Sequence, residues 1–166
     1  MNRKRCGELS ELAFLYKASS LGLNVSKPYG DSSRYDFVVE HHGRVMKVQV
    51  KSTSQSRYGG HYLSPQRRSR KGCLPYLSDE VDYIAARIVP EDLWYIIPLA
   101  VIQSHCSVRL YPQRPERDWR FGAYREAWDL LRSPSSDPGL GLFTIDACAD
   151  EAFLSPAEHF AAASRL

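Results

Sequence analysis

Within the segment RVMKVQVKS at residues 44–52, residues 46–51 alternate strictly between apolar and polar side chains. Side chains in a β-strand point to opposite faces with a period of two, so this alternation predicts a strand with one apolar and one polar face. The apolar face carries Met46, Val48 and Val50, and the polar face carries Lys47, Gln49 and Lys51. The preceding segment YDFVVEHH, at residues 35–42, also predicts a strand, and the intervening His42-Gly43 suits a short hairpin. The chain is therefore expected to fold around a β-hairpin.

Helical and strand patterns alternate along the rest of the chain. Residues 7–21 carry apolar side chains near helical spacing and end before Gly22, which predicts an amphipathic helix. Residues 81–89 and 93–99 are apolar, β-branched and aromatic, which predicts central strands buried on both faces. Further predicted elements are a short strand at 23–25, a short helix at 100–105, a strand or extended edge at 107–112 and a helix at 119–132. Together these patterns predict an α/β domain with a central mixed sheet of about five strands flanked by helices.

The composition fits one globular domain. The chain has 166 residues, of which 43% are hydrophobic and 25% charged, and a chain of this length buries enough surface to fold without disulfides. The four cysteines are far apart, form no CxxC pair and have no histidine at zinc-ligand spacing, which indicates reduced thiols: Cys6, Cys73, Cys106 and Cys148. No signal peptide or membrane span is expected, so the expected location is the cytoplasm of a bacterial-type cell.

A run rich in proline and serine, SPSSDPG, divides the chain near Pro134. Such a run ends the last predicted helix of the body. We therefore expect one domain at residues 1–133, with a basic loop inserted at 54–76, followed by a C-terminal extension at 134–166. The extension is expected to pack on the core or to take part in oligomerisation.

The charge is unevenly distributed. Residues 1–76 carry a formal charge of +9 and residues 77–166 carry −6, although the net charge is only +3. A basic half indicates a polyanionic partner, because each phosphate neutralised by lysine or arginine releases counterions. Nucleic acid is the favoured partner and an anionic membrane surface the second. The densest basic cluster is expected on a loop, together with Arg57, Tyr58 and Tyr62: Arg67, Arg68, Arg70 and Lys71. The alternatives are a solvated surface run and a loop that docks on an acidic protein.

Four polar residues lie where a phosphodiesterase site could use them: Glu11 on the predicted first helix, Asp36 at the start of one strand, and Gln49 and Lys51 on the next. Phosphodiester hydrolysis requires a hard divalent cation held by oxygen ligands, an activated water, and positive charge that stabilises the pentacovalent oxyanion. Carboxylates and a glutamine carbonyl supply such oxygens. The two-residue step from Gln49 to Lys51 places a metal ligand beside an ammonium. No glycine-rich phosphate cradle follows any strand, so no nucleotide cofactor is expected.

The segments that hold these residues, GELSE, PYGDSSRYDFVV and KVQVKS, resemble the PD-(D/E)XK nuclease superfamily. Within it they are most similar to the branch that contains a group I intron homing endonuclease, in which glutamine replaces the acid of the last motif. The resemblance extends over roughly residues 7–132 and implies the restriction-endonuclease-like α/β fold. It also implies metal-dependent, site-specific cleavage of double-stranded DNA by a homodimer or homotetramer.

The resemblance implies a role for each candidate residue. Asp36 matches the metal ligand, Gln49 the substituted acid and Lys51 the catalytic lysine. Glu11 matches the helix carboxylate, with Glu8 as the alternative. The implied cofactor is Mg²⁺, replaceable by Mn²⁺. Its implied ligands are Asp36, Gln49 and the backbone carbonyl of Val50, with Glu11 assisting directly or through water.

Two positions depart from the family pattern. Tyr35 stands where the motif has proline, a residue that shapes the backbone and contributes no ligand. Gln49 is neutral, so the site loses one negative charge. An amide carbonyl still ligates a cation, but the metal affinity or the number of bound metals is expected to fall.

DNA contacts are expected from the basic loop and from residues next to the candidate lysine. Ser52 and Gln55 follow Lys51 and either bond phosphate or end the strand. The expected DNA-binding residues are Arg34, Ser52, Gln55, Arg57, Tyr58, Arg67, Arg68, Arg70 and Lys71. Two other functions remain open: a structure-selective nuclease of the Holliday-junction kind, and a catalytically weak DNA-binding module on the nuclease fold.

Overall fold

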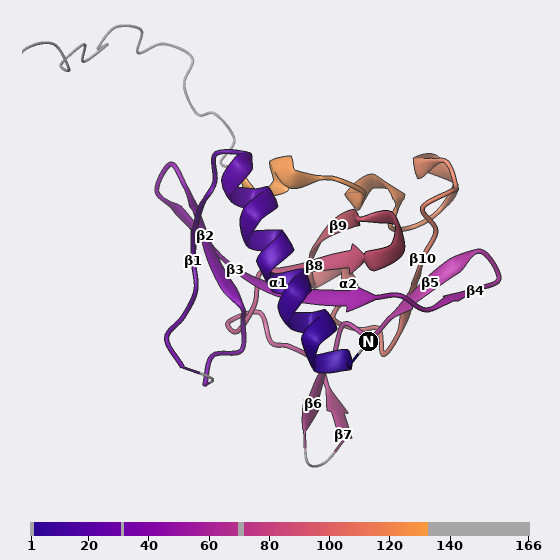
Figure 1. Cartoon of the computed structure of the whole chain (residues 1–166), viewed down its shortest axis with the longest axis horizontal. Helices are drawn as coiled ribbons and strands as arrows, with labels where there is room; N and C mark the ends of the chain where they lie inside the picture. The colour runs from indigo at the N-terminus through magenta and orange to yellow at the C-terminus, as the bar shows by residue number, and fades with distance from the viewer. Residues whose placement is uncertain (1, 31, 70–71, 133–166) are drawn as a thin grey trace, which may run out of the picture. The chain divides into compact units, whose positions relative to one another are not determined.

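The alternating segment forms the central strand of a five-stranded sheet. The computed structural model describes residues 2–30, 32–69 and 72–132 (Figure 1). The sheet has the strand order β1-β2-β3-β8-β9. Its strands are β1 (Asn24–Ser26), β2 (Phe37–His41), β3 (Arg44–Thr53), β8 (Tyr83–Ile88) and β9 (Leu93–Pro98). Only β3 and β8 pair in parallel, and the other neighbours are antiparallel. The predicted α/β class with a central mixed sheet is therefore confirmed.

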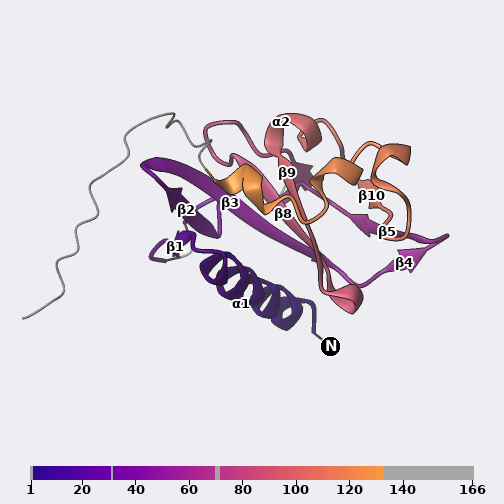
Figure 2. The same ribbon diagram turned by 90° about the horizontal axis from the view of Figure 1, so that it is seen from above.

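The sheet has a separate apolar core on each face. Helix α1 (Arg3–Ser20) covers one face, where Phe14 packs with side chains of β2, β3 and β9. The short helix α2 (Leu99–Ile102) lies on the opposite side (Figure 2). Residues of β8 alternate between the two cores, with Ala85 in the first and Ile84 and Ala86 in the second. Strand β8 is thus buried on both faces, as its largely apolar sequence predicts.

Helix α1 differs from its prediction in its start and in its buried face. It begins at Arg3, four residues before the predicted start. Its sheet-facing positions are Ser10, Phe14 and Ala18, which are spaced by four and are almost fully buried. Leu12 and Tyr16, which the apolar pattern places toward the core, are 62% and 77% exposed. The sheet accepts only one narrow stripe of the helix, so several of its apolar residues face outward.

The basic segment that is predicted to be a loop folds into two small antiparallel hairpins. Strands β4 (Ser56–Arg57) and β5 (Gly60–Leu63) pair, and β10 (Val108–Leu110) extends them into a three-stranded sheet. Strands β6 (Arg67–Ser69) and β7 (Gly72–Leu74) form the second hairpin. Tyr58 and Gly59 have φ of 53° and 73°, the positive values of a two-residue hairpin turn. Gly59 therefore belongs to a tight turn that connects two strands, and not to an open loop.

The helix predicted at residues 119–132 is absent. The segment forms two short 3₁₀ turns, η3 (Gly122–Tyr124) and η4 (Trp128–Leu131). A similar turn, η2 (Glu116–Asp118), precedes the segment, and η1 (Val89–Glu91) precedes β9. Glu126 has φ of 50° and accepts hydrogen bonds from the Trp94 N–H at 2.7 Å and the Trp128 indole N–H at 2.8 Å. Trp128 enters one core and Phe121 the other. A straight helix on one face of the sheet cannot place side chains in the cores of both faces. Tertiary packing therefore overrides the helical pattern.

Several expectations fall on residues outside the described part of the chain. These are the C-terminal extension after residue 133, the thiol of Cys148, and the side chains of Arg70 and Lys71. Within the described part, Cys6, Cys73 and Cys106 carry free thiols. None of the described helices combines the length and the apolar character needed to cross a membrane.

Phe14 is the test of the core between α1 and the sheet. Its ring is fully buried, with its centroid 5.3 Å from that of Phe37, 5.8 Å from Trp94 and 5.6 Å from Trp128. Phe14→Ala should lower the free energy of unfolding by about 3–5 kcal/mol, because it removes a large buried ring. The matched substitution Tyr16→Ala, on the exposed face of the same helix, should change it by less than about 0.5 kcal/mol. Equal losses in urea denaturation would contradict this packing.

Candidate active site

Asp36 is fixed at the start of β2 by hydrogen bonds to β3. Its backbone N–H donates to the Val48 carbonyl at 3.0 Å, and its carboxylate oxygen Oδ2 accepts from the Val50 N–H at 2.8 Å. The same oxygen accepts from the Gln49 side-chain amide at 2.5 Å. Antiparallel pairing of β2 with β3 places these groups opposite each other. The structure thus brings together Asp36, Gln49 and Val50, as the sequence predicts.

The Asp36 carboxylate oxygen and the Val50 carbonyl oxygen both lie against the Gln49 side-chain amide. The Gln49 amide nitrogen donates both to Asp36 Oδ2 and, at 3.2 Å, to the Val50 carbonyl oxygen. The two ends of a glutamine amide are nearly the same size, so a half-turn of the amide would present its carbonyl oxygen instead. The donor set then consists of a carboxylate, an amide carbonyl and a backbone carbonyl. These hard oxygen ligands fit a divalent cation such as Mg²⁺ or Mn²⁺.

The neutral Gln49 amide distinguishes this group of oxygens from an acidic cluster. Among the described residues, no three side chains of His, Cys, Asp or Glu lie close enough to hold a metal ion. Here an amide and a main-chain carbonyl lie beside the single carboxylate of Asp36. The two neutral groups add no negative charge to that carboxylate.

Burial disfavours the charge on Asp36. Desolvation raises the pKa of its carboxyl above the ordinary value, and the nearby Glu11 carboxylate raises it further. The Val50 N–H, the Gln49 amide and the Lys51 ammonium act in the opposite direction. The raised pKa means that the hydrogen bonds and the nearby ammonium do not fully offset the cost of burying the negative charge of Asp36. A cation bound beside Asp36 would offset this cost further.

Lys51 lies two residues along β3 and is held by groups that the sequence analysis did not identify. Its ammonium donates to the Tyr76 hydroxyl at 3.0 Å and to the Gln66 carbonyl at 3.2 Å. Burial lowers the pKa of Lys51, while the nearby Asp36 carboxylate acts in the opposite direction. Tyr76 is only 5% exposed, and burial raises its pKa to about 12, so its hydroxyl remains protonated at neutral pH. No spacing in the sequence indicates this contact, because Tyr76 lies in the connection between β7 and β8, 25 residues after Lys51.

Glu11, rather than Glu8, is the helix carboxylate near this group. Glu11 affects the pKa of Asp36 and accepts a hydrogen bond from the Lys27 ammonium at 2.8 Å. This contact raises the pKa of Lys27, chiefly through the hydrogen bond and the charge of Glu11. Glu8 has a 58% exposed side chain and lies 4.0 Å from the Lys4 ammonium. Lys27 is a second residue that the sequence analysis did not single out.

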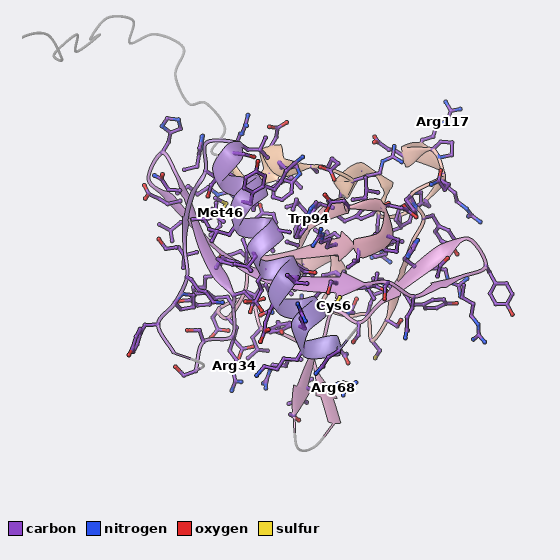
Figure 3. All side chains as sticks on the ribbon, in the orientation of Figure 1. Cys6, Arg34, Met46, Arg68, Trp94 and Arg117 are labelled. Atoms are coloured by element: carbon purple, nitrogen blue, oxygen red, sulfur yellow. The ribbon has the colours of Figure 1, made fainter. Side chains whose placement is uncertain are left out.

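A cavity of about 440 Å³ opens beside Lys51. Its lining includes Ser52, Gln55 and Arg68, three of the residues expected to bind DNA. It also includes Cys6 of α1, whose sulfur lies 3.9 Å from the Ser52 hydroxyl. Figure 3 shows Cys6 near the start of α1 and Arg68 on the β6–β7 hairpin, two sides of this cavity. Hydroxyl and guanidinium groups therefore extend the polar surface outward from Lys51.

The other expected DNA-binding residues divide into two groups. Arg34 and Arg67 both face Glu80, with nitrogen–oxygen distances of 3.7 Å and 3.9 Å, so their charges are partly neutralised. Arg57 and Tyr58 are exposed on the β4–β5 hairpin. The structure thus places Ser52, Gln55 and Arg68 on the cavity beside Lys51, and it places Arg34 and Arg67 near Tyr76.

Comparison with known proteins identifies similar chains. A family model described as PD-(D/E)XK endonuclease matches residues 1–131. The solved structure of the bacterial homing endonuclease I-Ssp6803I is 30% identical, with a TM-score of 0.69, and the match covers 79% of this chain and 93% of that one. The structure of MepB is 12% identical over 68% of this chain and 83% of its own, with a TM-score of 0.36 that carries no argument. The comparison with curated proteins gives no match.

The raised pKa of Asp36 predicts the pH dependence of stability. The folded chain binds the Asp36 proton more tightly than the unfolded chain, so the free energy of unfolding falls as pH rises from the ordinary pKa of 3.8 through the higher folded value. In EDTA at pH 7, Asp36→Asn should therefore be more stable than wild type. The difference in the free energy of unfolding between Asp36→Asn and wild type should become smaller as the pH falls through the pKa of Asp36 in the folded chain.

The exposed Asp129 provides the control for this comparison. Its side chain is 90% exposed, so Asp129→Asn should leave stability nearly unchanged. Urea denaturation of the three proteins across pH measures the effect. A wild-type protein more stable than Asp36→Asn at pH 7 would contradict the unfavourable burial of the carboxylate.

Proposed function

The chain belongs to the PD-(D/E)XK endonuclease family, and we propose that it is a divalent-metal-dependent enzyme that cuts double-stranded DNA at specific sites, as a homing endonuclease does. The family and the nuclease class predicted from the motifs are confirmed by the family match. The observation that carries the finer proposal is the convergence of the Asp36 carboxylate and the Val50 carbonyl on the Gln49 amide. Lys51 follows two residues later on the same strand.

We assign the cation ligands to Asp36, Gln49 and the backbone carbonyl of Val50, with Glu11 assisting directly or through water. The hard oxygen donors favour Mg²⁺, and Mn²⁺ would substitute. Such a cation supplies Lewis-acid polarisation of the phosphate and a more acidic bound water. Asp36 has the largest part in holding it, because its buried carboxylate is incompletely compensated by the surrounding protein.

Lys51 supplies the positive charge of the site. Its ammonium would position the attacking water and stabilise the charge that develops on the phosphate oxygens. Two acceptors, the Tyr76 hydroxyl and the Gln66 carbonyl, fix its direction before substrate binds. A charge fixed in advance requires no reorganisation during the reaction, which is the condition for effective electrostatic stabilisation. Ser52, Gln55 and Arg68 would bond phosphates of the strand that enters the adjacent cavity.

We propose a homodimer or homotetramer as the active form. One chain has one such group of residues in its described part, whereas cutting both strands of a duplex at one place requires two. A twofold arrangement of chains would present one site to each strand, because the two backbones of a duplex are related by twofold symmetry.

A second candidate function follows from Gln49. In the structure its amide donates to two of the proposed ligands, and no carboxylate takes its place. A site with this reduced charge would suit a DNA-binding module that retains the nuclease fold and binds metal weakly. Such a module would bind DNA equally well in EDTA and would cut none.

Cleavage of supercoiled plasmid and of a library of duplex sites separates the two functions. Wild type should cut in Mg²⁺ or Mn²⁺ and not in EDTA. Asp36→Ala and Lys51→Ala should each lower the rate by at least about a hundredfold, because the first removes the main ligand of the cation and the second removes the positive charge that stabilises the phosphate oxygens. Asp129→Ala, a charge removal at an exposed position, is the control. Cutting that survives EDTA or both substitutions would contradict the proposal, and binding without cutting on every substrate would favour the module.

Tyr76→Phe tests how Lys51 is held. The substitution keeps the buried ring and removes the hydroxyl that accepts from the ammonium. The turnover number should fall roughly tenfold, the effect of losing one hydrogen bond to a charged group. Tyr95→Phe is the matched control, since Tyr95 is fully buried, its pKa is also about 12, and its hydroxyl has no hydrogen-bond partner. Equal effects of the two variants would show that the Tyr76 hydroxyl has no specific part.

A further inference from the structure

The three-stranded sheet β10-β5-β4 has two chemically different faces. Its inner face carries side chains that are at most 5% exposed: His61, Leu63, Val108 and Leu110. The strand register pairs Tyr62 with Arg109 and Gly60 with Arg57, which places these four residues on the outer face. The inner face faces the apolar core, whereas on the outer face Arg57 is exposed and Arg109 is half-buried.

The outer face is organised by stacking of arginine on tyrosine. The guanidinium carbon of Arg109 lies 4.4 Å from the centroid of the Tyr62 ring, and Arg109 Nη1 donates to the Tyr111 hydroxyl at 3.1 Å. The Arg114 guanidinium lies 4.1 Å from the centroid of the Tyr111 ring. We call these residues the arginine–tyrosine face: Arg57, Tyr62, Arg109, Tyr111 and Arg114. A stacked guanidinium keeps its N–H edge free for an anion.

Gly60 makes room for this arrangement. A Cβ atom at this position would lie 2.6 Å from Arg109 Cγ and 2.7 Å from the Tyr111 ring. Its φ is not positive, so the backbone itself would accept another residue. The requirement for glycine here therefore comes from the close approach of the two side chains across β5.

The arginines of this face are not neutralised by nearby carboxylates of the described residues. Arg57, Arg109 and Arg114 form no ion pair with any carboxylate that the structure describes, and each lies over a tyrosine ring. In contrast, five arginines elsewhere do pair with carboxylates: Arg34, Arg67, Arg87, Arg125 and Arg132. Three uncompensated guanidinium groups, two on the small sheet and one in the turn after β10, indicate an anionic partner.

The arginine–tyrosine face continues from the candidate active site. Tyr62, on which Arg109 stacks, also lines the cavity beside Lys51 together with Ser52 and Arg68. An anionic strand that leaves this cavity past Tyr62 therefore reaches Arg109 directly. Repeated phosphate groups satisfy guanidinium groups spaced along such a path.

We propose that the arginine–tyrosine face binds the sugar–phosphate backbone of the duplex next to the cleaved phosphate. This inference rests on the proposed function, because it takes DNA as the substrate. Arg109 provides the central contact, held in place by Tyr62 and Tyr111, and Arg57 extends the contact toward the end of the β4–β5 hairpin. Contacts to phosphate strengthen binding without selecting a sequence.

Binding of a fluorescent, mixed-sequence DNA duplex in EDTA tests this surface without cleavage. Arg109→Gln and Arg57→Gln should each weaken binding roughly three- to tenfold, and the plot of log affinity against log salt should become shallower by about 0.9 for each lost phosphate contact. Lys17→Gln removes the same charge from the last turn of α1 and should change neither quantity. Gly60→Ala keeps every charge but displaces Arg109, and it should also weaken binding.

The outcomes separate this inference from the proposed function. If wild type binds DNA while both arginine variants match Lys17→Gln in affinity and salt dependence, the face is not a DNA contact and the inference fails, although the nuclease proposal stands. If wild type neither binds nor cuts DNA, the proposed function fails and the inference fails with it. Thermal melting of each variant confirms that it remains folded.

Discussion

The hydrogen bond from the Val50 N–H to the Asp36 carboxylate is the interaction on which the candidate site depends. It joins Asp36, the residue directly before β2, to the middle of β3. The Asp36 carboxylate, the Val50 backbone carbonyl and the Gln49 amide therefore lie next to one another. The pairing of β2 with β3 also sets the position of Lys51, because side chains on a strand cannot shift relative to one another. A change in this register by one residue would move all of these groups to the wrong face.

This arrangement has a cost in stability that the surrounding structure offsets. Burial disfavours the charged forms of both Asp36 and Lys51, as the opposite directions of their pKa shifts show. Apolar cores on both faces of the sheet stabilise the fold and hold the two charged groups in place. The same rigidity keeps them directed at an incoming phosphate. Unfavourable burial of charge in a stable sheet is typical of sites where stability is exchanged for activity.

The sequence predicts the parts of this structure that follow from local periodicity. Alternation along residues 44–52 places Gln49 and Lys51 on one face, and the structure bears this out. The contacts of Lys51 with Tyr76 and of Arg109 with Tyr62 join segments far apart in the chain, so no local pattern reveals them. The pattern at 119–132 is helical, yet Glu126 adopts positive φ in order to bond the edge of β9. In each failure a tertiary contact outweighs local preference.

Calorimetric titration of Mn²⁺ into the metal-free protein tests whether Asp36, Gln49 and Val50 form one cation site. We expect weak binding of the cation by wild type, loss of binding in Asp36→Asn, and tighter binding in Gln49→Glu, because a carboxylate adds a negative charge to the site. Asp129→Asn, at an exposed position, should bind as wild type does. Unchanged Mn²⁺ affinity in Asp36→Asn would contradict a cation site at these residues, whatever the protein does to DNA.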